Sequence, residues 1–172
     1  MTESTSARDR VVAQIRNEQQ ACREVVAEVG EQRMNEPGPM GDWSFRDLAA
    51  HLLGWRERTL SQLEAVAAGR EAPPDPWPAD LGDDDDAVND WIQRESEGRA
   101  TEEILADIDG SFDRLAAALG ALPEEALTDP AGLAGFEEGG AAAEMDWVSH
   151  WHEEHEPDVR AWLSSASAPS RR

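Results

Sequence analysis

Lysine and tyrosine are absent from this chain of 172 residues, and cysteine occurs once, as Cys22. A single cysteine excludes a disulfide within the chain, and such sparing use is typical of a reducing compartment. Long apolar runs are missing too, since none approaches the roughly 20 residues that span a bilayer. The opening segment, MTESTSARDR, has no apolar core of the kind that secretory signals carry. Together these absences predict a cytoplasmic protein.

Positive charge is also scarce. Fifteen basic residues, all of them arginine, face 37 acidic residues, and the formal net charge is −22. A protein that binds nucleic acid needs clustered lysine or arginine to displace the counterions of the phosphates, and this sequence has no such cluster. Anionic membrane surfaces are disfavoured for the same reason. We therefore expect neither nucleic acid nor a membrane as a partner.

Helical periodicity dominates what is present. Apolar residues recur at spacings of three and four, which is the pattern of a helix with one buried face. The pattern covers four stretches: about residues 7–29, 44–68, 101–119 and 141–163. Gly120 is expected to end the third stretch, and no segment has a convincing strand pattern. The sequence therefore predicts an all-α fold, a four-helix bundle.

The length of the chain suits a single core, so we expect one domain over residues 1–163. Residues 164–172, SSASAPSRR, are polar and are expected to form a disordered tail. The second helix has a defined start in the sequence SFRD. Ser44 can cap this helix, and Asp47 stands three residues further on, as in a capping box.

One connection is much longer than the others. The stretch GREAPPDPWPADLGDDDD contains four prolines and a run of four aspartates, which predicts a loop. Carboxylates favour the N-terminus of a helix, so the aspartate run is expected to start a short extra helix. That helix would carry Val88, Trp91 and Ile92 on one side. The predicted architecture is thus a four-helix bundle with one long connection that carries a short extra helix.

The histidines are unevenly distributed. Three of the four lie in SHWHEEHEPDVRAWL, and His51 lies about a hundred residues upstream. His152 and His155 share one face of a straight helix, whereas His150 points roughly 100–160° away from each of them. Two histidines one turn apart, with a third from a facing helix, can build a metal site in a bundle. Three imidazoles suit zinc, nickel or iron and leave positions open for water or substrate.

Other interpretations of these histidines stay open. His51 lies among apolar residues, where a buried histidine with one hydrogen-bond partner is common, and helices rich in His and Glu are often merely solvated. Pro157 complicates the cluster, because its ring clashes with the carbonyl of Glu153 and no hydrogen bond forms there. We therefore expect the helix to be kinked or locally unwound near the histidines.

Three segments resemble the DinB-like superfamily of four-helix proteins, which includes the mycothiol-dependent maleylpyruvate isomerases. They are GDWSFRDLAAHLLGWRER, DAVNDWIQRESEGRATEEILADIDGSFDRLAAALGALPEEAL and HWHEEHEPDVRAWL. The first looks like the start of the family's second helix, the next like its third-helix region, and the last like its fourth helix. The resemblance implies a bundle that holds a divalent metal on one ligand from helix two and two ligands from helix four.

His51 matches the ligand of helix two, and His155 matches the last ligand of helix four. The family usually places its remaining ligand four residues before the last one, and here Trp151 occupies that position. Three interpretations stay open. His152 substitutes from the next position, or Asp146 pairs with His150 at the family's spacing, or the site is degenerate and binds no metal.

The first hypothesis is an enzyme whose metal would be bound by His51, His152 and His155. Glu154, or its neighbour Glu153, would serve as a base or as an acceptor from an imidazole N–H. The activity would be that of a transferase, isomerase or hydrolase, which attacks a small electrophilic substrate with a low-molecular-weight thiol or water. The alternative is a metal-free self-resistance protein that sequesters or hydrolyses a reactive natural product. A scaffold that forms a homodimer is a third hypothesis.

Overall fold

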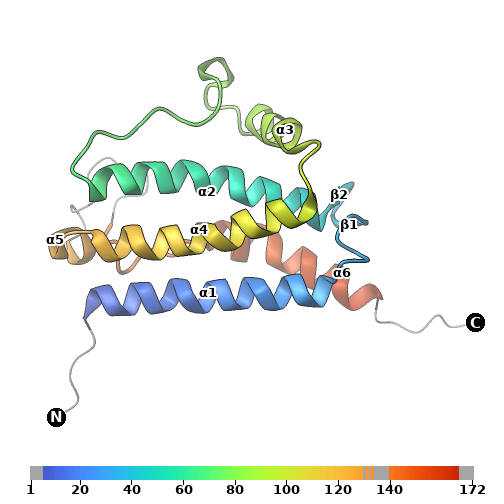
Figure 1. The fold of residues 1–172 in the computed structure, drawn as a ribbon, viewed down its shortest axis with the longest axis horizontal. Coiled ribbons are helices and arrows are strands. Elements are labelled where there is room, and N and C mark those ends of the chain that lie inside the picture. The colour runs from blue at the N-terminus through green and yellow to red at the C-terminus, as the bar shows by residue number, and fades with distance from the viewer. Residues whose placement is uncertain (1–5, 130, 132, 134–139, 167–172) are drawn as a thin grey trace, which may run out of the picture.

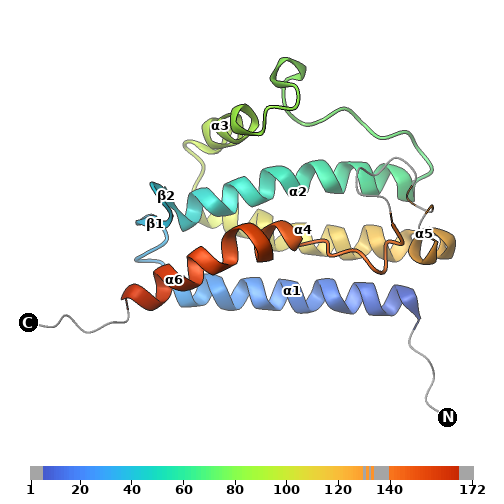
Figure 2. The same ribbon diagram turned by 180° about the vertical axis from the view of Figure 1, so that it is seen from behind.

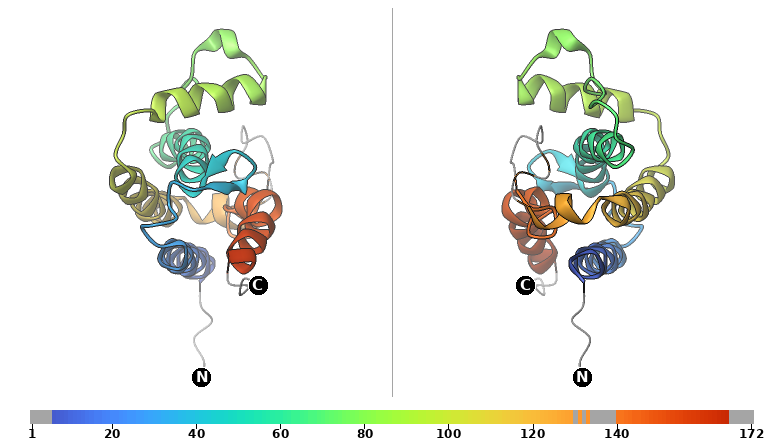
Figure 3. Two further views of the ribbon diagram at one scale, coloured as in Figure 1. Left: turned by 90° about the vertical axis from the view of Figure 1, so that its right-hand side faces the viewer. Right: turned by 90° about the vertical axis from the view of Figure 1, so that its left-hand side faces the viewer.

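Four helices lie alongside one another in the computed structural model, which describes residues 6–129, 131, 133 and 140–166. They are α1 (Ala7–Val29), α2 (Phe45–Ala67), α4 (Thr101–Ala121) and α6 (Glu156–Ala166). Figure 1 shows α4 between α1 and α2, and Figure 2 shows α6 on the opposite face. In the end-on views of Figure 3, α4 and α6 stand on opposite sides of the α1 and α2 pair. The predicted all-α bundle is confirmed.

The bundle is closed by long aliphatic side chains from facing helices. Each fully buried leucine contributes about 2 kcal/mol relative to an exposed one. The main cluster takes fully buried residues from three helices: Ile15, Leu60, Leu63, Leu115 and Leu119. Among the described residues, no helix is both long and apolar enough to cross a membrane.

The start of α2 follows the predicted capping box. Ser44 accepts a hydrogen bond from the Asp47 backbone N–H, and the Asp47 carboxylate accepts one from the Ser44 backbone N–H. Two N–H groups that would otherwise be unpaired at the helix end are thereby satisfied. The end of α4 differs from the prediction, because the helix runs through Gly120 to Ala121. Leu122 ends it in an extended conformation, which is the conformation that a following proline, here Pro123, imposes.

Two short strands also depart from the prediction. Pro37–Met40 (β1) and Trp43–Ser44 (β2) pair antiparallel in a small hairpin just before α2. The two prolines of β1 hide the strand pattern in the sequence. Gly38 sits directly against the Trp162 ring, where a Cβ would lie 2.6 Å from the indole nitrogen. The hairpin places Trp43 beside His51, with ring centroids 5.4 Å apart.

The long connection carries the predicted extra helix, α3 (Asp85–Ser96), after a short 3₁₀ turn at Ala79–Leu81. Asp84 caps α3 by accepting a hydrogen bond from the Ala87 backbone N–H. Figure 3 shows α3 lying across the outer side of α2. The contact is close because α2 has Gly54 where Ile92 of α3 docks, and a Cβ at Gly54 would lie 2.7 Å from that side chain.

The last helix begins later than residue 141, which corrects the predicted range. Residues 141–148 form turns instead, and helical structure starts at residues 149–150. The physical reason is a non-local pairing, in which the N–H groups of Ala142 and Ala143 donate to carbonyls of the short helix α5 (Glu124–Thr128). Asp146 then accepts from the Val148 N–H in a local turn. Residues 164–166 of the predicted tail continue α6, and residues 167–172 lie outside the described residues.

Candidate metal centre

Three imidazole nitrogens converge at the junction of α2 and the start of the last helix. Nε2 of His150 lies 3.0 Å from Nε2 of His51 and 3.1 Å from Nε2 of His155. Each of the three rings offers one nitrogen, and these atoms all lie within 4.8 Å of one another. His51 and His155 are buried, whereas His150 is exposed. The cluster is therefore closed on the bundle side and open on one side.

A π-helical turn over Trp151–His155 brings His150 and His155 together. In a straight α-helix, residues five apart differ by about 140° around the axis. A π turn closes i→i+5 hydrogen bonds and brings such residues close to one face. The N–H of Glu156 donates to the carbonyl of Trp151, five residues back. Pro157 has no N–H to donate to Glu153, so the regular i→i+4 ladder cannot continue at this point.

His152 points elsewhere, towards α1. Its Nδ1 lies 2.7 Å from a carboxylate oxygen of Glu156, and its Nε2 lies 3.1 Å from a carboxylate oxygen of Glu18. Of the predicted ligands, the structure thus brings His51 and His155 together and leaves His152 outside the cluster. His150 takes the third place. The Asp146 carboxylate, from the second interpretation, bonds to the Val148 backbone instead.

The environment keeps the clustered imidazoles neutral at pH 7. Burial, and then the neighbouring His155 and His150, lower the pKa of His51 to about 3. Burial and the neighbouring His150 lower the pKa of His155 to about 4. The pKa of His150 is also lowered by burial, against an opposing effect of Glu154. Neutral imidazole is the form that binds a metal ion, so little proton release is needed at neutral pH.

The residues fit a divalent cation. Separations of 3.0 and 3.1 Å between ring nitrogens are close to those of adjacent ligands on one ion whose metal–nitrogen bonds are about 2.0–2.1 Å. Without an ion, the Nε2 atom of His150 must serve two neighbours with a single lone pair or a single proton. The Nδ1 atoms of His51 and His155 are buried without a hydrogen-bond partner. Histidine ligands usually have such a partner, so we expect affinity about 10–100-fold below that of a fully supported site.

In the metal-free protein, stability is expected to fall as the pH decreases from 6.5 towards 4. The folded-state pKa values of His51 and His155, about 3 and about 4, lie below the ordinary value of 6.5. The unfolded chain therefore binds protons first, at about 1.4 kcal/mol per pH unit for each proton, and this part of the stability is complete only above pH 6.5. Urea unfolding at several pH values, with chelator present, measures the slope.

His152 affects this titration with the opposite sign. Burial acts to lower the pKa of His152, but its hydrogen bond to Glu156 and the charge of Glu18 outweigh burial and raise the pKa. Its contribution to stability is therefore complete below pH 6.5 and is lost as the pH rises through the raised value. The matched variants are His51→Gln, which should flatten the slope below pH 6.5, and His152→Gln, which should leave that slope unchanged and remove the loss of stability that occurs as the pH rises above 6.5. Equal slopes in all three proteins would contradict the assignment.

Glu154, the predicted base, lies in the π turn and is exposed. Its negative charge acts to raise the pKa of both His150 and His155, so it lies near their rings. Trp43 packs against His51 from the hairpin side. A cavity of about 420 Å³ opens beside the cluster, lined by His150, Arg56 and three indole rings among others. Of the three clustered histidines, His150 thus lines a cavity of small-molecule size.

Comparisons with known proteins agree with this architecture. The family model described as the mycothiol maleylpyruvate isomerase N-terminal domain matches residues 15–160, which include all three clustered histidines. No curated protein and no solved structure gave a match. The family model covers most of the chain, and the observed helical bundle is the fold that the resemblance implied. The chain therefore belongs to the mycothiol maleylpyruvate isomerase N-terminal domain family, within the DinB-like superfamily.

Proposed function

We propose that this protein binds a divalent transition metal through His51, His150 and His155 and acts on a small electrophilic substrate. The nucleophile would be a low-molecular-weight thiol or water, and the reaction would be a transfer, an isomerisation or a hydrolysis. The observation that carries the proposal is the convergence of three neutral Nε2 atoms, one of which belongs to a residue that lines a cavity, His150. Zinc, nickel and iron are the metals that suit three imidazoles.

When bound, such an ion would supply Lewis acidity, which lowers the pKa of a thiol or water molecule beside it. His51 and His155 would hold the buried side of the ion, and His150 the side towards solvent. Trp43 would shield His51 from water. Glu154 is exposed near His150 and His155, and we assign it the role of proton acceptor during attack by the nucleophile.

A metal-free role is the second candidate, and the cavity supports it. Trp55, Trp147 and Trp151 line the cavity, and indole rings provide large apolar surfaces for a ligand. A self-resistance protein could sequester or hydrolyse a reactive natural product in such a space. The histidine cluster favours the metal-dependent role, because a purely apolar binding site gains nothing from three converging imidazoles, two of them buried.

Elemental analysis of the full chain as purified tests the proposal. About one metal ion per chain is expected, and zinc at about 100 times its Kd should stabilise the folded protein by about 2.7 kcal/mol. Addition of a thiol to cobalt-loaded protein should produce a thiolate-to-cobalt absorption band if the thiol reaches the ion. A protein that binds no metal, and whose ligand-induced tryptophan quenching is unaffected by chelator, would instead support the metal-free role.

A further inference from the structure

Arg56 is a half-buried cation on α2 that has no carboxylate partner among the described residues. Its guanidinium lies over the Phe112 ring, 4.0 Å from the ring centroid, and its Nη1 atom donates to the Ser111 hydroxyl at 3.1 Å. Burial lowers the pKa of Arg56 to about 10, so the side chain is still charged at pH 7. Buried charges are normally paired, because an isolated one is costly to desolvate. Arg56 therefore calls for a reason beyond packing.

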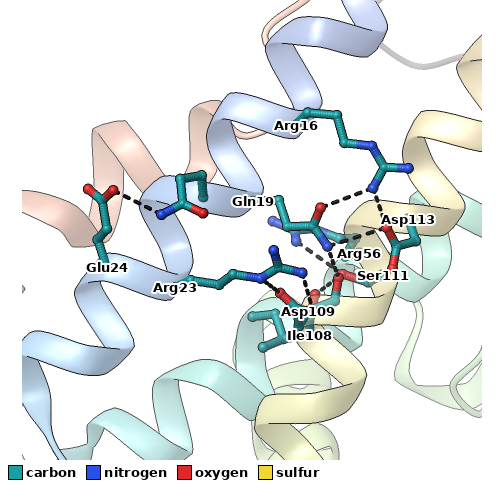
Figure 4. Close-up of polar contacts among 10 residues, drawn as sticks. Arg16, Gln19, Arg23, Glu24, Arg56, Ile108, Asp109, Ser111 and Asp113 are labelled. Carbon is teal, nitrogen blue, oxygen red and sulfur yellow. Dashed lines mark hydrogen bonds and ion pairs between the residues drawn. The ribbon is translucent and has the colours of Figure 1, made fainter.

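The nearest acidic groups of α4 are already paired with other arginines, as Figure 4 shows. Both carboxylate oxygens of Asp109 accept from Arg23, at 2.6 and 2.8 Å. Asp113 pairs with Arg16. Arg16 and Arg23 on α1 thus have carboxylate partners, whereas the half-buried Arg56 forms no ion pair within the part of the chain that the structure describes.

Ser111 holds the Arg56 guanidinium in place and leaves most of its donors available. The Ser111 hydroxyl donates to the Ile108 carbonyl at 2.6 Å, so its oxygen is free to accept from Arg56. One of the five guanidinium N–H groups is used in this contact. Arg56 is half-buried, and its other nitrogens form no hydrogen bond with the described residues.

Those donors belong to a side chain that lines the cavity beside the histidine cluster. The cavity of about 420 Å³ has Arg56 and His150 in its lining, together with Trp55, Trp147 and Trp151. Its size is that of a small-molecule site, in which a few polar groups among aromatic walls fix the orientation of the ligand. A planar guanidinium matches the two oxygens of a carboxylate and can donate to both.

We propose that Arg56 is the receptor for a carboxylate group on the molecule that occupies this cavity, with Ser111 as the positioning residue for the guanidinium. The proposal rests on the proposed function only in placing the reactive end of that molecule at the histidine cluster. The carboxylate belongs either to the electrophilic substrate or to the thiol. Because the net charge of the chain is −22, anions are repelled from most of the molecule, and a preference for a carboxylate requires a local cation.

Two matched probe pairs test the proposal on the full chain. The first pair is 3-phenylpropionate and 3-phenylpropionamide, and the second is N-acetylcysteine and N-acetylcysteamine, which lacks the carboxylate. Binding is followed by tryptophan fluorescence and calorimetry, in chelator-treated and in zinc-loaded protein. The wild type is expected to bind at least one carboxylate about tenfold or more tightly than its neutral partner, as a charge-assisted hydrogen bond implies. A preference within the first pair assigns the carboxylate to the electrophilic substrate, and a preference within the second pair assigns it to the thiol.

The variants separate this role from a structural one. Arg56→Met should abolish the carboxylate preference while unfolding at no lower urea concentration than the wild type, because a half-buried charge without a carboxylate partner among the described residues is removed. Arg56→Lys keeps the charge but not the fork, and should lose several-fold of the preference. Arg114→Gln removes a positive charge that is paired with Glu57 and Glu64 on the surface, and should keep the preference.

Two results would overturn the proposal: equal binding of the carboxylate and its neutral partner in both probe pairs by the wild type, or an undiminished preference in both Arg56 variants. The test is independent of the metal, since the zinc affinity of Arg56→Met is measured separately and is expected to equal that of the wild type. A chain that binds no zinc but prefers carboxylates through Arg56 would reject the metal-dependent function and retain this site. A chain that binds zinc but shows no preference for carboxylates would reject only the carboxylate site.

Discussion

His150→Ala is expected to lower zinc affinity by about a hundredfold or more, whereas His152→Ala should keep the wild-type affinity within a few-fold. Loss of an outer partner of a ligand already costs about 10–100-fold, and loss of a ligand itself should cost at least as much. His150 shares the cluster with His51 and His155, at nitrogen separations of 3.0 and 3.1 Å. His152 is held by Glu18 and Glu156 instead.

Competition with a chromophoric chelator measures both affinities, and circular dichroism checks that each variant is folded. His51→Ala and His155→Ala should behave like His150→Ala. His152→Ala breaks the partly exposed contacts of the π turn with Glu18 of α1 and Glu156 of α6, so its cost in stability should be about 1 kcal/mol or less. If His152→Ala loses zinc and His150→Ala does not, the last helix has the register of a straight α-helix and the proposed ligand set is wrong.

Pro157→Ala is expected to weaken zinc binding by about tenfold or more while stabilising the metal-free protein by up to about 3 kcal/mol. The new N–H can donate to the Glu153 carbonyl, which Pro157 leaves without an i→i+4 partner, and a proline inside a helix costs about that much. A regular α-helix would then replace the π turn and rotate His150 away from His155. At this position, a residue that stabilises the helix is therefore expected to weaken the metal site.

Hydrogen exchange at the backbone amide that Pro157→Ala introduces reports whether the new hydrogen bond forms, and zinc titration reports the site. Pro123→Ala is a suitable control, because it removes a proline at the N-terminal cap of α5, away from the histidines. That control variant should leave zinc affinity unchanged. If the introduced amide is protected from exchange and zinc affinity nevertheless equals that of the wild type, the proposed link between the π turn and the cluster is contradicted.

Local signals account for the elements that were predicted well. The boundaries of α1 agree with the apolar spacing, and the capping box at Ser44 and Asp47 forms as expected. The aspartate run does start α3, with Asp84 as its cap. In each case the interactions that select the structure join residues within one turn, so their identities and spacing are readable directly from the chain.

Interactions between distant residues explain where the predictions fail. The last helix starts late because Ala142 and Ala143 pair with α5, and this pairing has no counterpart in local spacing. The hairpin before α2 is stabilised by packing of Gly38 on Trp162, from the other end of the chain. Arg56 was not predicted as a site residue, because only the folded bundle shows that neighbouring carboxylates are paired elsewhere.

One part of the histidine cluster was predictable from local sequence, and another part depends on contacts between distant residues. Periodicity places His51 on a buried helix face. The sequence also shows the histidine-rich segment, and Pro157 predicts that the helix is disturbed there. Which histidine joins His51 and His155 depends on how the disturbed turn is accommodated against α1 and α2. The Glu18 and Glu156 carboxylates hold His152 on the α1 side, and the wide turn over Trp151–His155 brings His150 inward. Pro157 lacks the N–H that a regular α-helix needs, so the hydrogen bonds shift by one residue at this turn. Contacts with other helices select this arrangement, and it makes His150 the third member of the cluster.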